Sequence, residues 1–267
     1  MKQFITLFLL PLTVLSATTV FGAELDNKAS YDSFKQKIVA EYSGREPKEW
    51  GETVSGVKTE LATYDIVIAL TLDACGSPKG KGFDSVLINY LEREKIPATL
   101  FINARWIDAN RDLFLRLAAN PLFEIANHGM HHKPASVNGQ SVYGINGTKD
   151  IGELVDEIEA NALKIQKLTG KKPNYYRSGT AYYDEVAVAV ANRLGSTVVG
   201  FNVLADAGAT YNRKQVKQAL LEAEPGAIVI MHMNHPEGQT AAGTIEAIPE
   251  LKKRGFIFVK LSDYELR

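Results

Sequence analysis

From Tyr64 onward, segments that have the character of buried strands alternate with segments that have the period of an amphipathic helix. Seven strands are predicted, at residues 66–72, 98–102, 123–126, 174–177, 197–204, 227–231 and 256–261. Most are continuously apolar, which is typical of strands covered by helices on both faces. The alternation predicts an α/β protein with parallel strands and right-handed crossovers. A doubly wound sheet and a barrel both fit, but no G-x-G-x-x-G fingerprint follows the first strand.

The first 23 residues have the pattern of a secretory signal peptide. A lysine precedes residues 4–15, which are apolar apart from two threonines and a proline, and small and polar residues follow. The apolar run is shorter than the roughly 20 residues of a spanning helix, which favours a signal peptide over a membrane anchor. We therefore expect residues 1–23 to be removed and the protein to be exported, to a periplasm or outside the cell, with no membrane span left.

Composition excludes several classes of partner and site. Lys and Arg number 30 against 31 Asp and Glu, and a net charge of −1 gives no footprint for nucleic acid. The single cysteine, Cys75, excludes an intrachain disulfide and any site with several cysteines. Residues 24–63 are polar and mixed, and we expect an N-terminal extension, with a helix near residues 31–42, packed on a main domain of residues 64–267.

The placement of the histidines indicates a functional site. All five lie just beyond the C-terminal ends of two predicted strands, at His128, His131, His132, His232 and His235. Asp73, Arg177 and Asp206 also follow predicted strand ends. In parallel α/β barrels this rim carries the active site, so we expect these side chains to meet there.

His128 and His132 are candidate metal ligands. Their spacing of four places two imidazoles on the same face of a helical turn, where they can share an ion. A metal site normally needs a third protein ligand, and a catalytic one keeps a position open for water or substrate.

An ordered set of short motifs follows the strand ends. They are TLDACG at residues 71–76, NHGMHH at 127–132, YRSG at 176–179, Asp206, and IMH at 230–232. In this order they resemble the NodB-homology polysaccharide deacetylases, carbohydrate esterase family 4, over residues 64–261. The resemblance implies a distorted (β/α)7 barrel and metal-dependent removal of N- or O-acetyl groups from sugar polymers.

The resemblance also assigns roles to residues that match the motifs. Asp73 corresponds to the general base, and His232 to the general acid. Arg177 corresponds to the arginine that holds the catalytic aspartate, and Asp206 lies where the family has an acidic residue that tunes the acid. His128 and His132 correspond to the two metal-binding histidines, so a divalent metal, by expectation zinc, is implied. Amide hydrolysis needs this set: an activated water, a stabilised oxyanion and a proton for the leaving amine.

The first motif departs from the family pattern at Ala74. The family has a second aspartate there, a metal ligand, and a methyl group cannot coordinate. Three remedies are open: Asp73 itself ligates, His131 or Cys75 substitutes, or the site works without metal. Gly129 also replaces the usual serine or threonine, and residues 177–181 replace the proline-rich third motif.

We expect an acetylated glycan as the substrate, with contacts from Asn234, His235 and Tyr176. The first two lie in a polar loop beyond the sixth strand, and a tyrosine ring can stack on a sugar. Two alternatives remain open: a hydrolase of a small non-glycan amide on the same barrel, and a non-catalytic glycan-binding protein with a decayed metal site.

Overall fold

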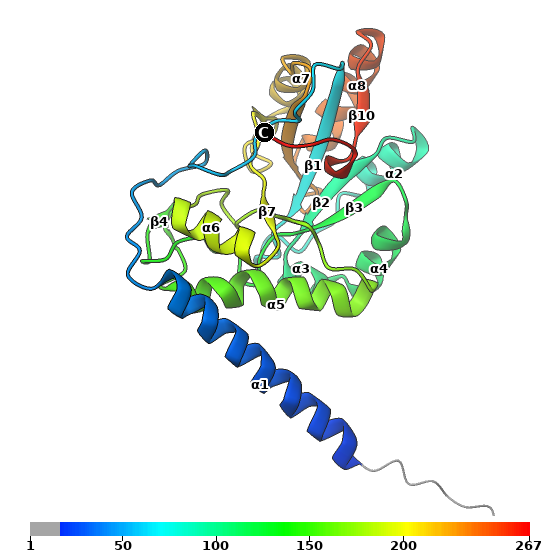
Figure 1. Ribbon diagram of the computed structural model, residues 1–267. Coiled ribbons are helices and arrows are strands. Elements are labelled where there is room, and N and C mark those ends of the chain that lie inside the picture. Colours follow the sequence, from blue (N-terminus) through cyan, green and yellow to red (C-terminus); the bar gives the residue numbers. More distant parts are fainter. Residues whose placement is uncertain (1–16) are drawn as a thin grey trace, which may run out of the picture.

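The computed structural model describes residues 17–267, so most of the predicted signal peptide, residues 1–16, lies outside the described residues. A twisted sheet of eight strands forms the centre of this part of the chain (Figure 1). The strands are β1 Val67–Ala74, β2 Ala98–Ile102, β3 Phe123–Asn127, β6 Tyr175–Tyr176, β7 Thr197–Val198, β8 Val203–Leu204, β9 Ala227–His232 and β10 Ile257–Val259. All pair in parallel, which confirms the α/β prediction.

Helices surround this sheet, and a small antiparallel hairpin lies apart from it. The helices are α1 Ala17–Tyr42, α2 Ser85–Arg93, α3 Ala104–Ala109, α4 Arg111–Ala119, α5 Ile151–Thr169, α6 Glu185–Arg193, α7 Arg213–Leu221 and α8 Thr240–Lys253, with a final 3-10 turn at Leu261–Asp263. The hairpin consists of β4 Ser141–Val142 and β5 Ile145–Asn146. Within residues 17–267, no helix has both the length and the apolar character that a bilayer span requires.

The sheet curls toward a closed barrel. Its strand order is β7-β6-β3-β2-β1-β9-β8, with β10 paired to the first half of β1. The strand predicted at residues 197–204 is therefore two short strands, which pair at opposite edges of the sheet. Residues 199–202 join them, and five residues of extended chain from Val198 to Val203 reach at most about 18 Å. The two edges must lie close together, which accounts for the distorted barrel.

Alternation along β1 sorts its side chains between two faces. Ile68, Leu70, Leu72 and Ala74 pack outward in one apolar cluster with α2, α4, α7 and α8. Val67 and Ala69 belong to a second cluster, which includes residues of β2, β3 and β9. Thr71 and Asp73 continue the inner face toward the C-terminal end of β1, so the polar groups of the site stand above an apolar barrel interior.

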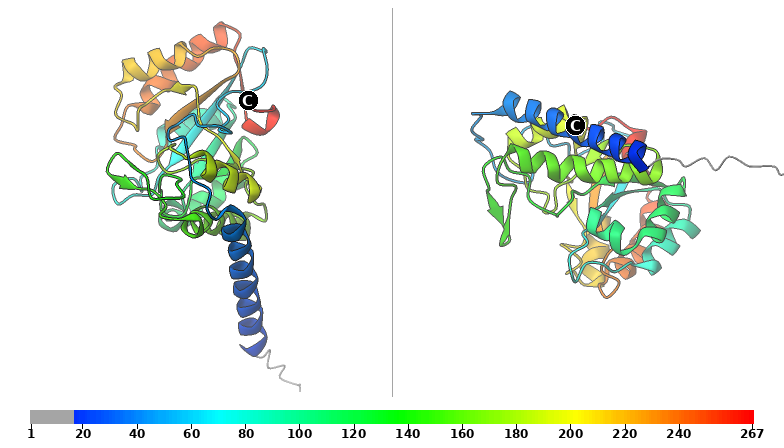
Figure 2. Two further views of the ribbon diagram at one scale, coloured as in Figure 1. Left: turned by 60° about the vertical axis from the view of Figure 1, so that its left-hand side comes forward. Right: turned by 90° about the horizontal axis from the view of Figure 1, so that it is seen from below.

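The N-terminal helix α1 contacts the rest of the chain through its last part. The last part of α1 lies along α5, while its first part projects from the body (Figures 1 and 2). Ile38 is fully buried between α1, α5 and α6. At the α1–α5 contact, Asp156 accepts hydrogen bonds from Tyr31 Oη at 2.9 Å and Lys35 Nζ at 2.5 Å.

Candidate functional site

Asp73 lies near the end of β1 and is almost fully buried. Its Oδ1 accepts a 2.8 Å hydrogen bond from Arg177 Nη1, and its Oδ2 lies 3.6 Å from His128 Nε2. Arg177 is fully buried, and its other contacts reach three further acceptors: Thr71 Oγ1 at 2.9 Å, Val199 O at 3.1 Å and Gly200 O at 2.7 Å. A buried guanidinium needs such partners, and in return it fixes the orientation of the Asp73 carboxylate.

His128 and His132 come together through a loop. Residues 128–134 form no helix, so the helical turn predicted for this motif is wrong. Instead, Gly129 and His132 adopt left-handed backbone conformations, with φ of 74° and 62°, and the chain folds back. The two imidazole rings meet edge to face, with centroids 4.9 Å apart. The predicted pairing of the two histidines is therefore present, by a different backbone route.

Buried polar groups hold this loop in shape. Asn103 Nδ2 donates to the carbonyl oxygens of residues 128–129 at 2.9 and 2.7 Å. Glu157, buried on α5, accepts hydrogen bonds from the backbone N–H groups of His131 at 2.9 Å and Lys133 at 3.1 Å. The Glu157 carboxylate thus satisfies backbone N–H groups of the loop that have no partner in a helix or strand.

Asp206 and His232 form the second charged pair. His232 Nδ1 lies 2.9 Å from Asp206 Oδ1, while His232 N and Thr240 Oγ1 donate to Asp206 Oδ2 at 2.7 and 2.9 Å. Burial by itself lowers the pKa of His232, but the charge and hydrogen bond of Asp206 outweigh it and raise that pKa well above its ordinary value. In the β1–β9 register His232 stands directly beside Asp73, so the two pairs are neighbours.

Cys75 completes a cluster with the two loop histidines. Its Sγ lies 3.7 Å from His128 Nε2, and one ligand atom from each of Cys75, His128 and His132 lies within 4.8 Å of the others. Burial by itself raises the pKa of the Cys75 thiol, but the positive charge of His132 and hydrogen bonds from neighbouring histidines hold it well below its usual range. His131, the other remedy considered for Ala74, is exposed and lies outside the cluster.

The residues present fit a divalent metal. His128 Nδ1 is engaged by Arg177 O at 3.0 Å, which leaves Nε2 as its available nitrogen. His132 Nε2 is buried without a hydrogen-bond partner among the described residues, and an ion would satisfy it. Ala74 is fully buried in the outward apolar cluster, so its methyl group packs in the core.

A cavity of about 420 Å³ opens onto this site. Asp73, His132 and His232 contribute to its lining, and Tyr143 and Ile145 of the β4–β5 hairpin form part of its wall. Tyr143 is 71% exposed, and its ring packs against that of Tyr182, with centroids 5.6 Å apart. The cavity thus combines charged groups with an aromatic wall.

Three residues expected to contact substrate do not line this cavity. Tyr176 is fully buried: β6 lies between β3 and β7, and the tyrosine ring joins the cluster beneath α5 and α6. Asn234 is also fully buried and donates to Gly80 O at 3.1 Å, so it shapes a neighbouring loop. His235 pairs with Glu237 at 2.7 Å at the surface.

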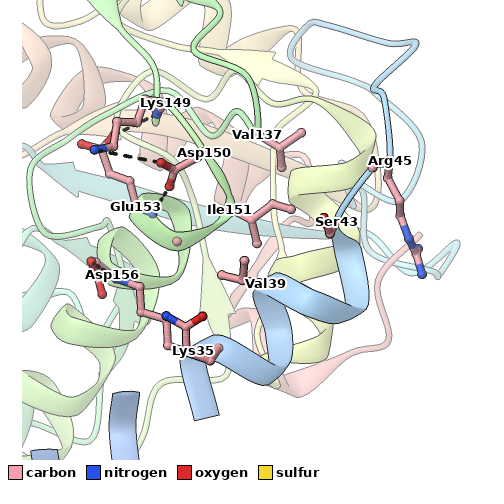
Figure 3. A pocket seen from close by; sticks show the side chains of 13 residues that line it. Lys35, Val39, Ser43, Arg45, Val137, Lys149, Asp150, Ile151, Glu153 and Asp156 are labelled. Carbon is pink, nitrogen blue, oxygen red and sulfur yellow. Dashed lines mark hydrogen bonds and ion pairs between the residues drawn. The ribbon is translucent and has the colours of Figure 1, made fainter. Parts of the chain in front are cut away.

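A larger cavity, of about 720 Å³, lies between α1 and the start of α5, away from these residues (Figure 3). Its charged groups are largely engaged within the protein. Lys35 pairs with Asp156, and the first-turn residue Glu153 pairs with Lys133, each at 2.5 Å. Val39 and Ile151 line the junction of the two helices. This cavity is therefore a packing gap between α1 and α5.

Two features of the site were not predicted from the sequence. The first is the pair of polar residues Glu157 and Asn161 on the buried face of α5. Both interrupt the row of apolar residues on that face, and this interruption could have indicated a buried polar contact. The β4–β5 hairpin lies in a stretch that reads as a glycine-rich loop, and a two-residue strand leaves too short a pattern to detect.

Comparisons with known proteins agree with the geometry. Peptidoglycan-N-acetylmuramic acid deacetylase PdaA of Bacillus subtilis is 25% identical over 206 residues, 75% of this chain and 72% of that protein. The chitooligosaccharide deacetylase of a Bradyrhizobium species is 24% identical over 184 residues, 64% of this chain and 78% of the relative.

Solved structures share the fold. The structure of Bacillus subtilis PdaA, a family 4 carbohydrate esterase, superposes with a TM-score of 0.63 at 22% identity, over 86% of this chain and 87% of that one. A family 4 pseudoenzyme from Bacillus anthracis gives 0.64 at 18% identity, over 79% and 69%. The family model described as polysaccharide deacetylase matches residues 61–199, more than half of the chain. The chain therefore belongs to the polysaccharide deacetylase family and is a hydrolase of that type.

Proposed function

We propose that this protein is an exported, metal-dependent deacetylase that hydrolyses acetyl groups, N- or O-linked, on a glycan. The observation that carries the proposal is that Asp73, His132 and His232 line one cavity. A carboxylate, a candidate metal ligand and a protonated imidazole are the groups that hydrolysis of an acetamide needs. The relatives named above act on peptidoglycan and chitooligosaccharide, which favours an acetylated amino-sugar polymer as substrate.

Asp73 is the proposed general base. Arg177 holds Oδ1, so Oδ2 is the oxygen left to accept a proton from the attacking water. The Arg177 charge also balances the carboxylate, which keeps the pair stable in a buried position. When bound at His128 and His132, the metal supplies Lewis acidity to the acetyl carbonyl and the water.

His232 is the proposed general acid. Its raised pKa keeps the imidazole protonated at neutral pH, and Asp206 orients the ring through Nδ1. Nε2 is then the atom that donates a proton to the departing amine nitrogen as the carbon–nitrogen bond breaks. Acetate and a free amino sugar are the products, and an O-acetyl substrate gives a free hydroxyl.

Release of acetate from acetylated chito-oligosaccharides and peptidoglycan fragments tests the proposal. Asp73→Asn keeps the shape of the side chain but removes the proton acceptor, so kcat should fall on the order of 10²–10⁴-fold. Circular dichroism and thermal unfolding of the variant serve as the control for folding. Near-wild-type turnover by Asp73→Asn would contradict the assignment of the base.

The same assay separates the proposal from a non-catalytic glycan-binding protein. Ala74 in the first motif, and the structural likeness to a family 4 pseudoenzyme, are the observations that favour this second candidate. A binding protein would retain oligosaccharide, measured by calorimetry, without releasing acetate from any substrate. A wild-type protein that binds the oligosaccharides and leaves them acetylated after metal loading would establish it.

A further inference from the structure

We propose that the Cys75 thiolate is a direct ligand of the metal, so that the site is a cysteine–histidine–histidine centre that prefers zinc or cobalt(II) over magnesium or manganese. The inference rests on the metal-dependent function proposed above and adds the third protein ligand to His128 and His132. It also gives Cys75, the sole cysteine of the chain, a chemical role.

Cys75 directly follows β1, which ends at Ala74. Side chains alternate between faces along a strand, so a chain that keeps its direction for one more residue brings residue 75 to the side of residue 73, away from residue 74. Ala74 packs in the outward core, whereas Asp73 faces inward toward Arg177 and His128. Cys75 Sγ accordingly reaches the same space, beside His128 Nε2. A ligand at position 75 therefore does not require one at position 74.

The spacing of the atoms matches a shared ion. In tetrahedral zinc sites, zinc–sulfur and zinc–nitrogen bonds of about 2.3 and 2.0 Å place the two ligand atoms roughly 3.5 Å apart. Cys75 Sγ and His128 Nε2 lie 3.7 Å apart. His132 supplies the third atom, and its Nε2 is buried without a partner among the described residues. Three ligand atoms thus converge, and one of them, His132 Nε2, has no hydrogen-bond partner among the described residues.

Asp73 is a poorer third ligand. Its Oδ1 is committed to Arg177, and its Oδ2 is the oxygen proposed to take the proton from water. The three-residue centre leaves the carboxylate free for this role. A centre of three protein ligands would also keep a fourth position for water or substrate. Asp73, His132 and His232 line the adjoining cavity.

The donor set dictates the metal preference. Thiolate is a soft ligand that selects zinc, whereas magnesium and manganese prefer carboxylate and water oxygens. Replacement of a carboxylate by a thiolate therefore biases the site toward thiophilic ions. An excess of magnesium should leave zinc bound.

Two measurements on the unmodified mature chain test the inference without any substrate. The first is the rate of Cys75 alkylation by iodoacetamide, which zinc should slow by more than about tenfold, because a metal-bound thiolate is withdrawn from reaction. The second is the spectrum of the cobalt(II) form, which should contain a thiolate-to-cobalt charge-transfer band in the near ultraviolet. A single cysteine makes both signals unambiguous.

Variants provide the matched comparison. Cys75→Ser should abolish the charge-transfer band and weaken zinc binding on the order of 10²-fold or more, since changes outside the ligand shell alone cost 10–100-fold. His131→Ala, an exposed histidine next to His132, should change neither. Equal zinc affinity of Cys75→Ser and wild type, without a band in wild type, would overturn the inference and leave a two-histidine site. Absence of zinc binding by wild type would overturn the metal part of the proposed function as well.

Discussion

Four charged side chains of the site form two pairs of opposite charge. Asp73 has Arg177 and His232 has Asp206, and the four residues come from different strand ends. Such pairing keeps buried charges stable, and it also sets which groups carry protons at neutral pH. The protonated state of His232 depends on Asp206, so the pH dependence of catalysis should report the pair.

Asp206→Asn should move the alkaline limb of the kcat profile toward lower pH. A histidine acid is active below its pKa, and Asp206 raises that pKa, so wild type retains the acid form into the alkaline range. Removal of the negative charge lowers the pKa, and the acid form is lost earlier as the pH rises. Acetate release measured across the pH range, with the acid limb as internal reference, checks this. An unchanged alkaline limb would mean that another group donates the proton.

The long buried strands were the most predictable elements, and the loops and the short strands at the sheet edges were the least. β1, β2, β3 and β9 lie within a residue or two of the predicted positions, because long buried runs leave a strong pattern. Residues 197–204 also read as one run, although β7 and β8 pair at opposite edges, since local sequence does not record which neighbour a strand meets. Tyr176 was expected to contact substrate and is buried instead. The sequence could not decide this, because an aromatic residue at a strand end suits a core or a rim equally.

The loop that carries the two candidate metal-binding histidines depends on Gly129. A β-carbon there would lie 2.3 Å from Glu157 Oε1, and the backbone is left-handed, with φ of 74°. Gly129→Ala should therefore destabilise the fold by about 1–3 kcal/mol and weaken zinc binding, because the loop must shift. Gly170 is the matched control: its φ is 78°, with nothing within 4 Å of an added β-carbon.

Thermal unfolding and zinc titration of the two variants separate backbone strain from the clash. Gly170→Ala should cost only the roughly 1–2 kcal/mol of a non-glycine residue in the left-handed conformation, and it should leave zinc affinity unchanged. Equal behaviour of the two variants would show that Glu157 does not constrain the loop.

The β4–β5 hairpin should contribute to substrate binding through Tyr143. Its ring lines the cavity and is largely exposed, so truncation removes a stacking surface and little core packing. Tyr143→Ala should raise KM for oligosaccharides roughly 2- to 10-fold with kcat little changed. Tyr64→Ala, at an exposed tyrosine outside the cavity lining, is the control. A fall in kcat at constant KM would argue against a binding role.

At the scale of the whole molecule, Arg177 ties the inner face of the sheet together. It binds Asp73 on β1 and the carbonyl oxygens of residues 199–200, where the chain passes from one sheet edge to the other. Arg177→Ala should lower the free energy of unfolding by about 3–5 kcal/mol, since it leaves the Asp73 carboxylate buried and unpaired. The double variant with Asp73→Asn should recover part of that loss, which urea denaturation can measure. Strict additivity of the two losses would show that the pair is not coupled.

The curling of the sheet has a consequence for how this enzyme can be shortened or inactivated. The proposed base belongs to β1, its arginine to the end of β6, and the proposed acid to β9, so segments spread along most of the chain must be assembled before any turnover. A fragment that ends near residue 199, where the family match stops, would lack Asp206 and His232 altogether. Deacetylation should thus require the last third of the chain: removal of residues 200–267 should abolish it, because Asp206 and the proposed acid His232 are both lost.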